Sequence, residues 1–111
     1  MGFAANQARL LALVARNSDL QLEMQFINQR RMALGNMISG VMDLQSNLAP
    51  DSQASKVLDA KIRQLQQADK LLEMHLNTAT SQQKAVDTQI DGVKQLIDKN
   101  IQRSFSFGGG R

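Results

Sequence analysis

Residues that commonly do chemistry in proteins are scarce in this chain. It holds one histidine, His75, and no cysteine, so thiolate nucleophiles, thiolate metal sites and disulfides are all excluded. Asp87 and Asp91 stand four residues apart, which places two carboxylates on one face of a helix, an ordinary surface arrangement. No nucleophile stands beside a base, and neither a glycine-rich phosphate loop nor a metal-ligand spacing occurs. We therefore expect no enzymatic activity, no cofactor and no metal site.

The polar residues of greater interest are Arg31, Asp69, Asn17 and Gln83. Each interrupts a series of regularly spaced apolar residues, so each side chain is expected between packed elements. A charge in such a place needs a partner, because an unpaired charge withdrawn from water is costly. The available partners depend on the elements that carry these residues.

Those elements are predicted to be two long helices. In the first half of the chain, apolar residues recur at alternating spacings of three and four, the period of a coiled-coil seam. Its apolar column, the d positions, holds Leu13, Leu20, Ile27, Leu34, Val41 and Leu48. Its mixed column, the a positions, holds Leu10, Asn17, Met24, Arg31, Ile38 and Gln45. The second half repeats the pattern, with d positions at Leu58, Leu65, Leu72, Ala79, Val86 and Val93 and a positions at Ile62, Asp69, Leu76, Gln83, Ile90 and Ile97.

A turn at Pro50 is predicted to separate the two helices. Proline disfavours helix at the residue before it and donates no backbone hydrogen bond. Asp51 or Ser52 can then cap a new helix. We expect helix over about 4–48, a loop at 49–51 and helix over about 52–104, so that residues 1–105 form a single antiparallel, all-α, two-helix coiled-coil hairpin. The Gly-rich residues 106–111 are expected to form a flexible tail, native or added.

Two stretches weaken the expected helices at a similar height. Asn17-Ser18-Asp19 followed by Gln21 can form a capping box, and Thr78–Ser81 has poor helix propensity. The two stretches suggest a zone of lower helix stability shared by both helices.

The four polar residues acquire partners if the chain folds back at Pro50. Residues whose numbers sum to about 100 then lie at one level, so Arg31 faces Asp69, Asn17 faces Gln83 and Gln45 faces Ser55. We expect these pairs to fix the register of the helices. Alternatively, Arg31 and Asp69 each extend separately to water.

More apolar residues lie outside the seam than a lone hairpin can bury, chiefly in the first half. The expected assembly face consists of Leu22, Phe26, Ala33, Met37 and Leu44, with Gly35 and Gly40 allowing close approach of another backbone. Exposed apolar area is unfavourable, and two helices make a thin core. The hairpin is thus expected to be completed by oligomerisation. A three- or four-helix fold, made by breaking each half, would bury the same residues internally.

Charge and hydropathy argue against nucleic acids and membranes as partners. The chain has 13 basic and 10 acidic residues, both signs are interspersed, and aromatic residues are few. No apolar run approaches the roughly 20 residues that cross a bilayer. No cleaved Sec signal is recognisable, so the expected location is cytoplasmic, or exported by another route.

The predicted architecture resembles the needle and filament subunits of type III secretion and flagellar systems. These are short, rich in Gln and Asn, cysteine-free, and built from two long helices around a Pro/Ser/Asn loop. The resemblance covers about residues 4–105 and implies export in an unfolded state followed by helical polymerisation. This chain departs from it in being longer and in ending with a Gly-rich tail. Residues 7–13 and 98–105 also resemble segments of short uncharacterised bacterial helical-hairpin proteins.

The sequence thus predicts a self-assembling structural subunit, a homo-oligomer or filament in which the assembly face binds the next copy. The alternative is an intracellular coiled-coil adaptor or secretion chaperone that binds a helix of a protein partner.

Overall fold

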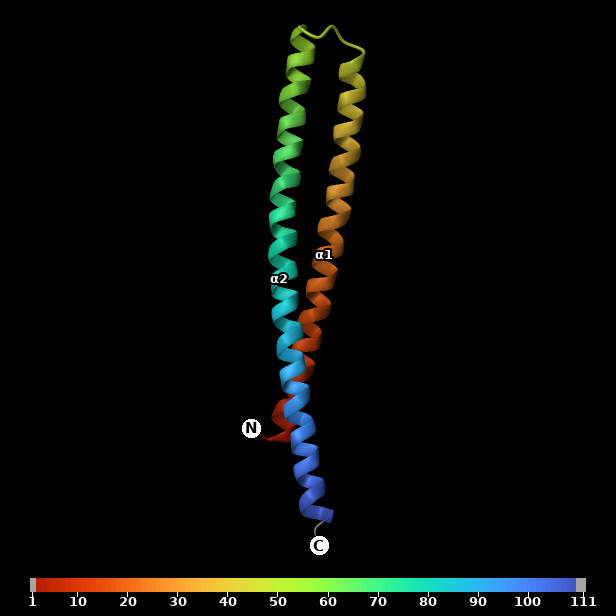
Figure 1. The fold of residues 1–111 in the computed structure, drawn as a ribbon. Helices are drawn as coiled ribbons and strands as arrows, with labels where there is room; N and C mark the ends of the chain where they lie inside the picture. Colours follow the sequence, from red (N-terminus) through yellow and green to blue (C-terminus); the bar gives the residue numbers. More distant parts are fainter. Residues whose placement is uncertain (1, 110–111) are drawn as a thin grey trace. The chain divides into compact units, whose positions relative to one another are not determined.

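The chain is an all-α helical hairpin, as predicted. The computed structural model describes residues 2–109, with side chains for residues 2–104. Helix α1 spans Phe3–Ser46 and helix α2 spans Gln53–Gly109, and no strand occurs between residues 2 and 109 (Figure 1).

The hairpin comprises two compact units, and the single domain predicted over residues 1–105 stays a prediction. Unit 1 comprises Met1–Leu22 and Thr80–Arg111, and unit 2 comprises Glu23–Ala79. Each unit pairs a segment of α1 with an antiparallel segment of α2. Both helices continue through the stretches that sequence propensity marks as weak, but the division between the units falls close to them.

The predicted seam residues are the ones withdrawn from solvent. In α1, every predicted a and d residue is buried or half-buried, and among the other described residues of that helix only Asn6 is not exposed. In α2, the residues that are buried or half-buried without having been predicted so are Ser55, Thr80 and Asn100. Asn6, Ser55 and Asn100 lie seven residues from predicted seam positions, so they extend the same columns. The coiled-coil period therefore decides burial along both helices, with Thr80 as the exception.

Each unit has its own narrow core. In unit 1, Leu20 packs with Val86 and Ile90, and Leu10 and Leu13 cover this cluster from the side. In unit 2, the buried apolar residues are Ile27, Ile62, Leu65 and Ala79. A core one side chain wide stabilises less than a multilayered core, because few apolar groups leave water completely.

The turn is built from local hydrogen bonds. At the end of α1, the amides of Asn47 and Leu48 donate to carbonyls three residues earlier. The Ser52 amide then donates to the Ala49 carbonyl at 3.0 Å, closing a β-turn with Pro50 at its second position, which suits the fixed φ of proline. The Ser52 hydroxyl accepts from the amide of Ser55 at 3.1 Å. Of the two capping residues that the sequence suggested, Ser52 is therefore the one that caps α2.

Both helices end at residues other than those expected. Helix α1 stops at Ser46 rather than near residue 48, because Ser46 and Asn47 donate side-chain hydrogen bonds to the Asp43 carbonyl and the chain then turns. Helix α2 continues to Gly109 rather than ending near residue 104, since the first glycine of the tail is Gly108. The last two residues of the expected tail, 110 and 111, lie outside the described part.

Two leucines of α1 in unit 1 provide a matched test of the seam. Leu20 is fully buried, whereas Leu11 is 72% exposed. Leu20→Ala should lower the free energy of unfolding by about 2–3 kcal/mol, through lost burial and the cavity left behind. Leu11→Ala should change it by less than about 0.5 kcal/mol. Urea titrations followed by circular dichroism, at one fixed protein concentration, would measure both. Equal midpoints for the two variants would contradict the seam.

Candidate interaction face

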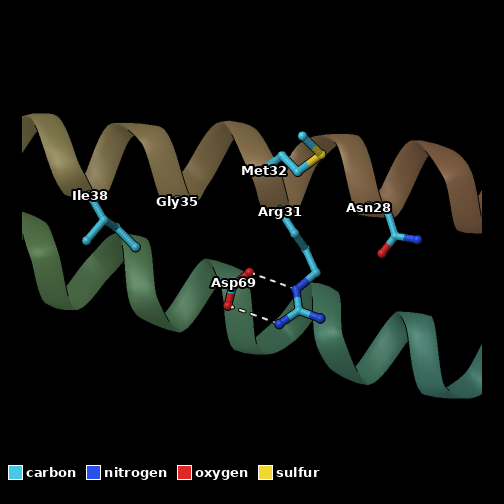
Figure 2. Close-up of a pocket in the computed structure, with 6 residues that line it drawn as sticks. All are labelled: Asn28, Arg31, Met32, Gly35, Ile38 and Asp69. Carbon is cyan, nitrogen blue, oxygen red and sulfur yellow. Dashed lines mark hydrogen bonds and ion pairs between the residues drawn. The ribbon is translucent and has the colours of Figure 1, made fainter.

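Arg31 and Asp69 meet across the seam of unit 2. The guanidinium Nε donates to one carboxylate oxygen at 2.9 Å and an NH2 nitrogen donates to the other at 3.3 Å, a two-point contact (Figure 2). The two side chains keep 30% and 33% of their surface exposed. The pair is therefore partly desolvated and still in contact with water. The sequence placed these residues opposite each other, and the structure brings them together.

The Asn17 and Gln83 side chains also meet, in unit 1. The Gln83 amide donates to the Asn17 carbonyl oxygen at 3.2 Å, and the Asn17 amide donates to Asp87 at 2.6 Å. Asp87, which the sequence reading treated as an ordinary surface acid, is thus a third member of this group. An acid one turn after a polar seam residue on the same helix was the signal that could have identified it.

A third polar layer lies beside the turn of unit 2. The Gln45 amide donates to the Ser55 carbonyl at 3.1 Å and also contacts the Ser55 hydroxyl and the Asp59 carboxylate. The polar residues of α1, Asn17, Arg31 and Gln45, are fourteen residues apart, as are their partners on α2. Polar layers therefore replace apolar ones in every second heptad. That these layers fix the register remains a prediction.

Arg31 lowers the pKa of the Asp69 carboxyl below its ordinary value of 3.8, mainly through the hydrogen bond it donates, although partial desolvation opposes the shift. The same hydrogen bond raises the pKa of Arg31 above its ordinary value, so its guanidinium stays charged. Because the pKa of Asp69 is depressed in the folded state, its contribution to stability is complete above the unfolded pKa. It is lost as the pH falls through the folded pKa.

The residues of the expected assembly face are all exposed, and they are divided between the two units. Leu22 belongs to unit 1 and the other six to unit 2. Gly35 lines a hollow with Arg31, Met32, Ile38, Asn28 and Asp69, on the flank where the ion pair reaches water (Figure 2). Ala33 lines a different hollow. Gly35 therefore lies on the other side of the seam from Ala33, as its heptad position also requires.

The hollow at Ala33 is formed by both helices of unit 2. It has a volume of about 400 Å³ and is lined by Arg30, Ala33, Leu34, Ala68, Leu71 and Leu72. In an antiparallel pair, the residues that directly precede the d positions of the two helices lie on the same flank. We call this surface the apolar flank. Its exposed small and apolar residues are Phe26, Ala33, Met37, Gly40 and Leu44 from α1 and Val57, Ala68 and Leu71 from α2.

The expected face was thus incomplete on α2. Val57 is 58% exposed and Leu71 is 53% exposed, and both lie on the apolar flank. Both residues directly precede d positions of α2, so the heptad pattern of the sequence could have placed them on the apolar flank. On the opposite flank, Met32 and Met42 are also exposed. In Figure 2 the Met32 side chain points away from α2.

No protein family matches this chain, and no curated protein or solved structure shows significant similarity to it. No helix within residues 2–109 is long and apolar enough to cross a membrane. Among the same residues, no three His, Asp or Glu side chains gather as metal ligands would.

A double-mutant comparison tests the register role of Arg31 and Asp69. Asp69→Leu leaves Arg31 in the seam without a partner, whereas Arg31→Met combined with Asp69→Leu gives an apolar layer. The single variant should therefore have a lower urea midpoint than the double variant. Equal midpoints would show that the two side chains are solvated independently.

Acid titration isolates the same carboxylate. Stability due to the ion pair should decline as the pH falls below 3.8, the ordinary carboxyl pKa, because the unfolded chain then takes up a proton at Asp69 while the pKa of the folded carboxyl is lower. Asp69→Asn has no such proton to bind, so its thermal midpoint should fall less between pH 5 and pH 2. Asp91→Asn, which changes an exposed acid of α2, is the matched control and should follow the unmodified chain. Parallel curves for all three proteins would contradict the shifted pKa.

Proposed function

We propose that this chain is a self-assembling structural subunit whose hairpins bind one another through the apolar flank. The observation that carries the proposal is the amount of apolar surface left after the seam is filled. Phe26, Leu44 and Leu71 are each more than half exposed, and Met37 is 49% exposed. Water contact with contiguous apolar area is unfavourable by about 25 cal/mol per Å², so association that covers the flank is favourable.

The lining of the hollow supports association with another helix. Two of its lining residues, Ala33 and Ala68, have small side chains, and the longer Arg30 and Leu71 also line it. A partner side chain entering between the helices would lose its own contact with water and contact apolar groups on both sides. Buried apolar anchors of this kind supply most of the binding energy in protein interfaces.

Growth beyond a pair requires a second contact. A face that binds its own copy closes into a dimer, and only an additional contact allows an oligomer or filament to extend. The opposite flank, with Met32 and Met42 exposed, supports such a contact. In this proposal assembly is the activity of the chain, and no catalytic step is involved.

Light scattering and analytical ultracentrifugation across a range of concentrations test this function. The unmodified chain should form a concentration-dependent oligomer. Met37→Glu combined with Leu71→Glu should weaken the first association step by about 30-fold or more, because two charges would lose water on binding. Met32→Glu on the opposite flank is the control, and it should retain the first step while stopping larger growth.

A chain that remains monomeric at high concentration would contradict the proposal. If such a monomer instead captured a defined helical peptide through the same flank, the alternative function of an adaptor or chaperone would replace it. Electron microscopy of the concentrated protein would show whether the larger species are filaments.

A further inference from the structure

We infer that the first assembly step is a two-fold symmetric pair in which the apolar flanks of two copies face each other and run in opposite directions. Phe26 of each copy then lies over Gly40 of the other. This inference rests on the proposed function, and it identifies the occupant of the flank as a second copy of this chain in a defined orientation.

The apolar flank has the period needed to pack against another helix. Along α1 its residues alternate by three and four, which repeats the spacing of the seam on a second side of the helix. These positions are Glu23, Phe26, Arg30, Ala33, Met37, Gly40 and Leu44. A helix with two such sides can pack against its own hairpin partner and a further helix at the same time.

The largest and the smallest of these residues lie at equal distances on either side of Ala33. Phe26 lies seven residues before it and Gly40 seven residues after it. Phe26 is 56% exposed, and a Cβ added to Gly40 would meet nothing within 4 Å. If α1 packs against α1 of a second copy in the opposite direction, with the two-fold axis at Ala33, the largest side chain meets the position with none. Arg30 then meets Met37, whose apolar side chain covers the arginine stem.

Helix α2 is consistent with the same axis. Ala68 lines the hollow together with Ala33, and the register of the Arg31–Asp69 contact places the two alanines close to one level of the hairpin. The two-fold axis therefore brings Ala33 against Ala33 and Ala68 against Ala68. Two small residues at the centre of both helices allow the hairpins to approach closely at the axis.

The other two-fold arrangement, with both hairpins pointing the same way, matches these residues less well. There α1 faces α2 of the second copy, at the register given by the Arg31–Asp69 pair. Phe26 would meet the bulky His75, and Gly40 would meet the charged Lys61. On α1 the opposed arrangement instead pairs the large Phe26 with Gly40, as close packing requires, while on α2 it brings His75 near Lys61 of the second copy.

The extent of the flank is at the lower limit of what a stable dimer needs. From Phe26 to Leu44 it runs for roughly 27 Å and it is two helices wide, about 20 Å, so its footprint is on the order of 500 Å² before surface relief is counted. Stable dimers bury about 800 Å² of accessible surface on each partner. Phe26 and Gly40 lie on the same side of α1, so they can face each other only when α1 packs against an antiparallel α1 of another copy. This favours a second copy of the chain over an unrelated helix as the partner.

Cysteine cross-linking tests the orientation directly, because the native chain has no cysteine. A disulfide forms only where two Cα atoms lie about 4.4–6.8 Å apart. Ala33→Cys alone and Ala68→Cys alone should each give a covalent dimer on mild oxidation of the full chain. Gly35→Cys, an equally exposed position on the opposite flank, is the matched control and should cross-link only at the rate found in urea.

The same-direction arrangement gives the reverse result. Neither single variant would cross-link to itself, but a mixture of the Ala33→Cys and Ala68→Cys proteins would. That outcome would overturn the inferred orientation while leaving the proposed self-assembly intact. A chain that sediments as a monomer and gives no cross-link in any combination would overturn both.

Exchange of sizes gives a second test that does not depend on oxidation. Gly40→Leu should raise the dimer dissociation constant at least 10-fold without harming the hairpin, because the site is open in the single copy. Gly35→Leu, also open, should leave the constant within 2-fold. The exchanged variant Phe26→Gly with Gly40→Phe should return toward the original constant, since each phenylalanine again faces a glycine. Equal weakening by the two leucine variants, or no recovery on exchange, would contradict the inference.

Discussion

Each helix of this hairpin buries only one side, and this limit governs the rest of the structure. Two helices share a single line of contact, so only the a and d residues leave water. Nearly every other described side chain stays in contact with water in the single hairpin. The narrow cores around Leu20 and Ile27 and the exposed Phe26, Met37 and Leu44 follow from the same geometry. A helix with apolar residues on two sides cannot bury both sides within a two-helix fold.

The single period also explains how much the sequence could predict. Heptad spacing identified the two helices, and it identified the buried positions because no competing element interrupts them. It also placed Arg31 opposite Asp69, since a turn at Pro50 fixes which residues share a level. Helix ends were less predictable, because they depend on side-chain hydrogen bonds such as those of Ser46 to the Asp43 carbonyl. Gly35 was predicted to lie on the same face as Ala33, because the prediction did not distinguish the two flanks of the seam.

Polar layers in the seam carry an energetic cost, and we expect them to supply specificity of register. An apolar pair in place of Arg31 and Asp69 would bury more area, yet it would allow neighbouring heptads to pair almost equally well. Buried polar residues at a positions are the best-attested device for specifying register in coiled coils. The third layer, at Gln45 and Ser55, lies next to the turn and so acts where the two helices first meet.

The fourteen-residue repeat of the polar layers has a consequence for misfolding. Sliding one helix by a single heptad would set Arg31 against an apolar residue, Ile62 or Leu76, and would be strongly disfavoured. Sliding by two heptads, roughly 21 Å, would again match polar with polar, Arg31 meeting Ser55 or Gln83. The seam alone therefore tolerates a shifted isomer. The short, hydrogen-bonded connection from Asn47 to Ser52 excludes it, because a displacement of that size would require unwinding a long stretch of helix.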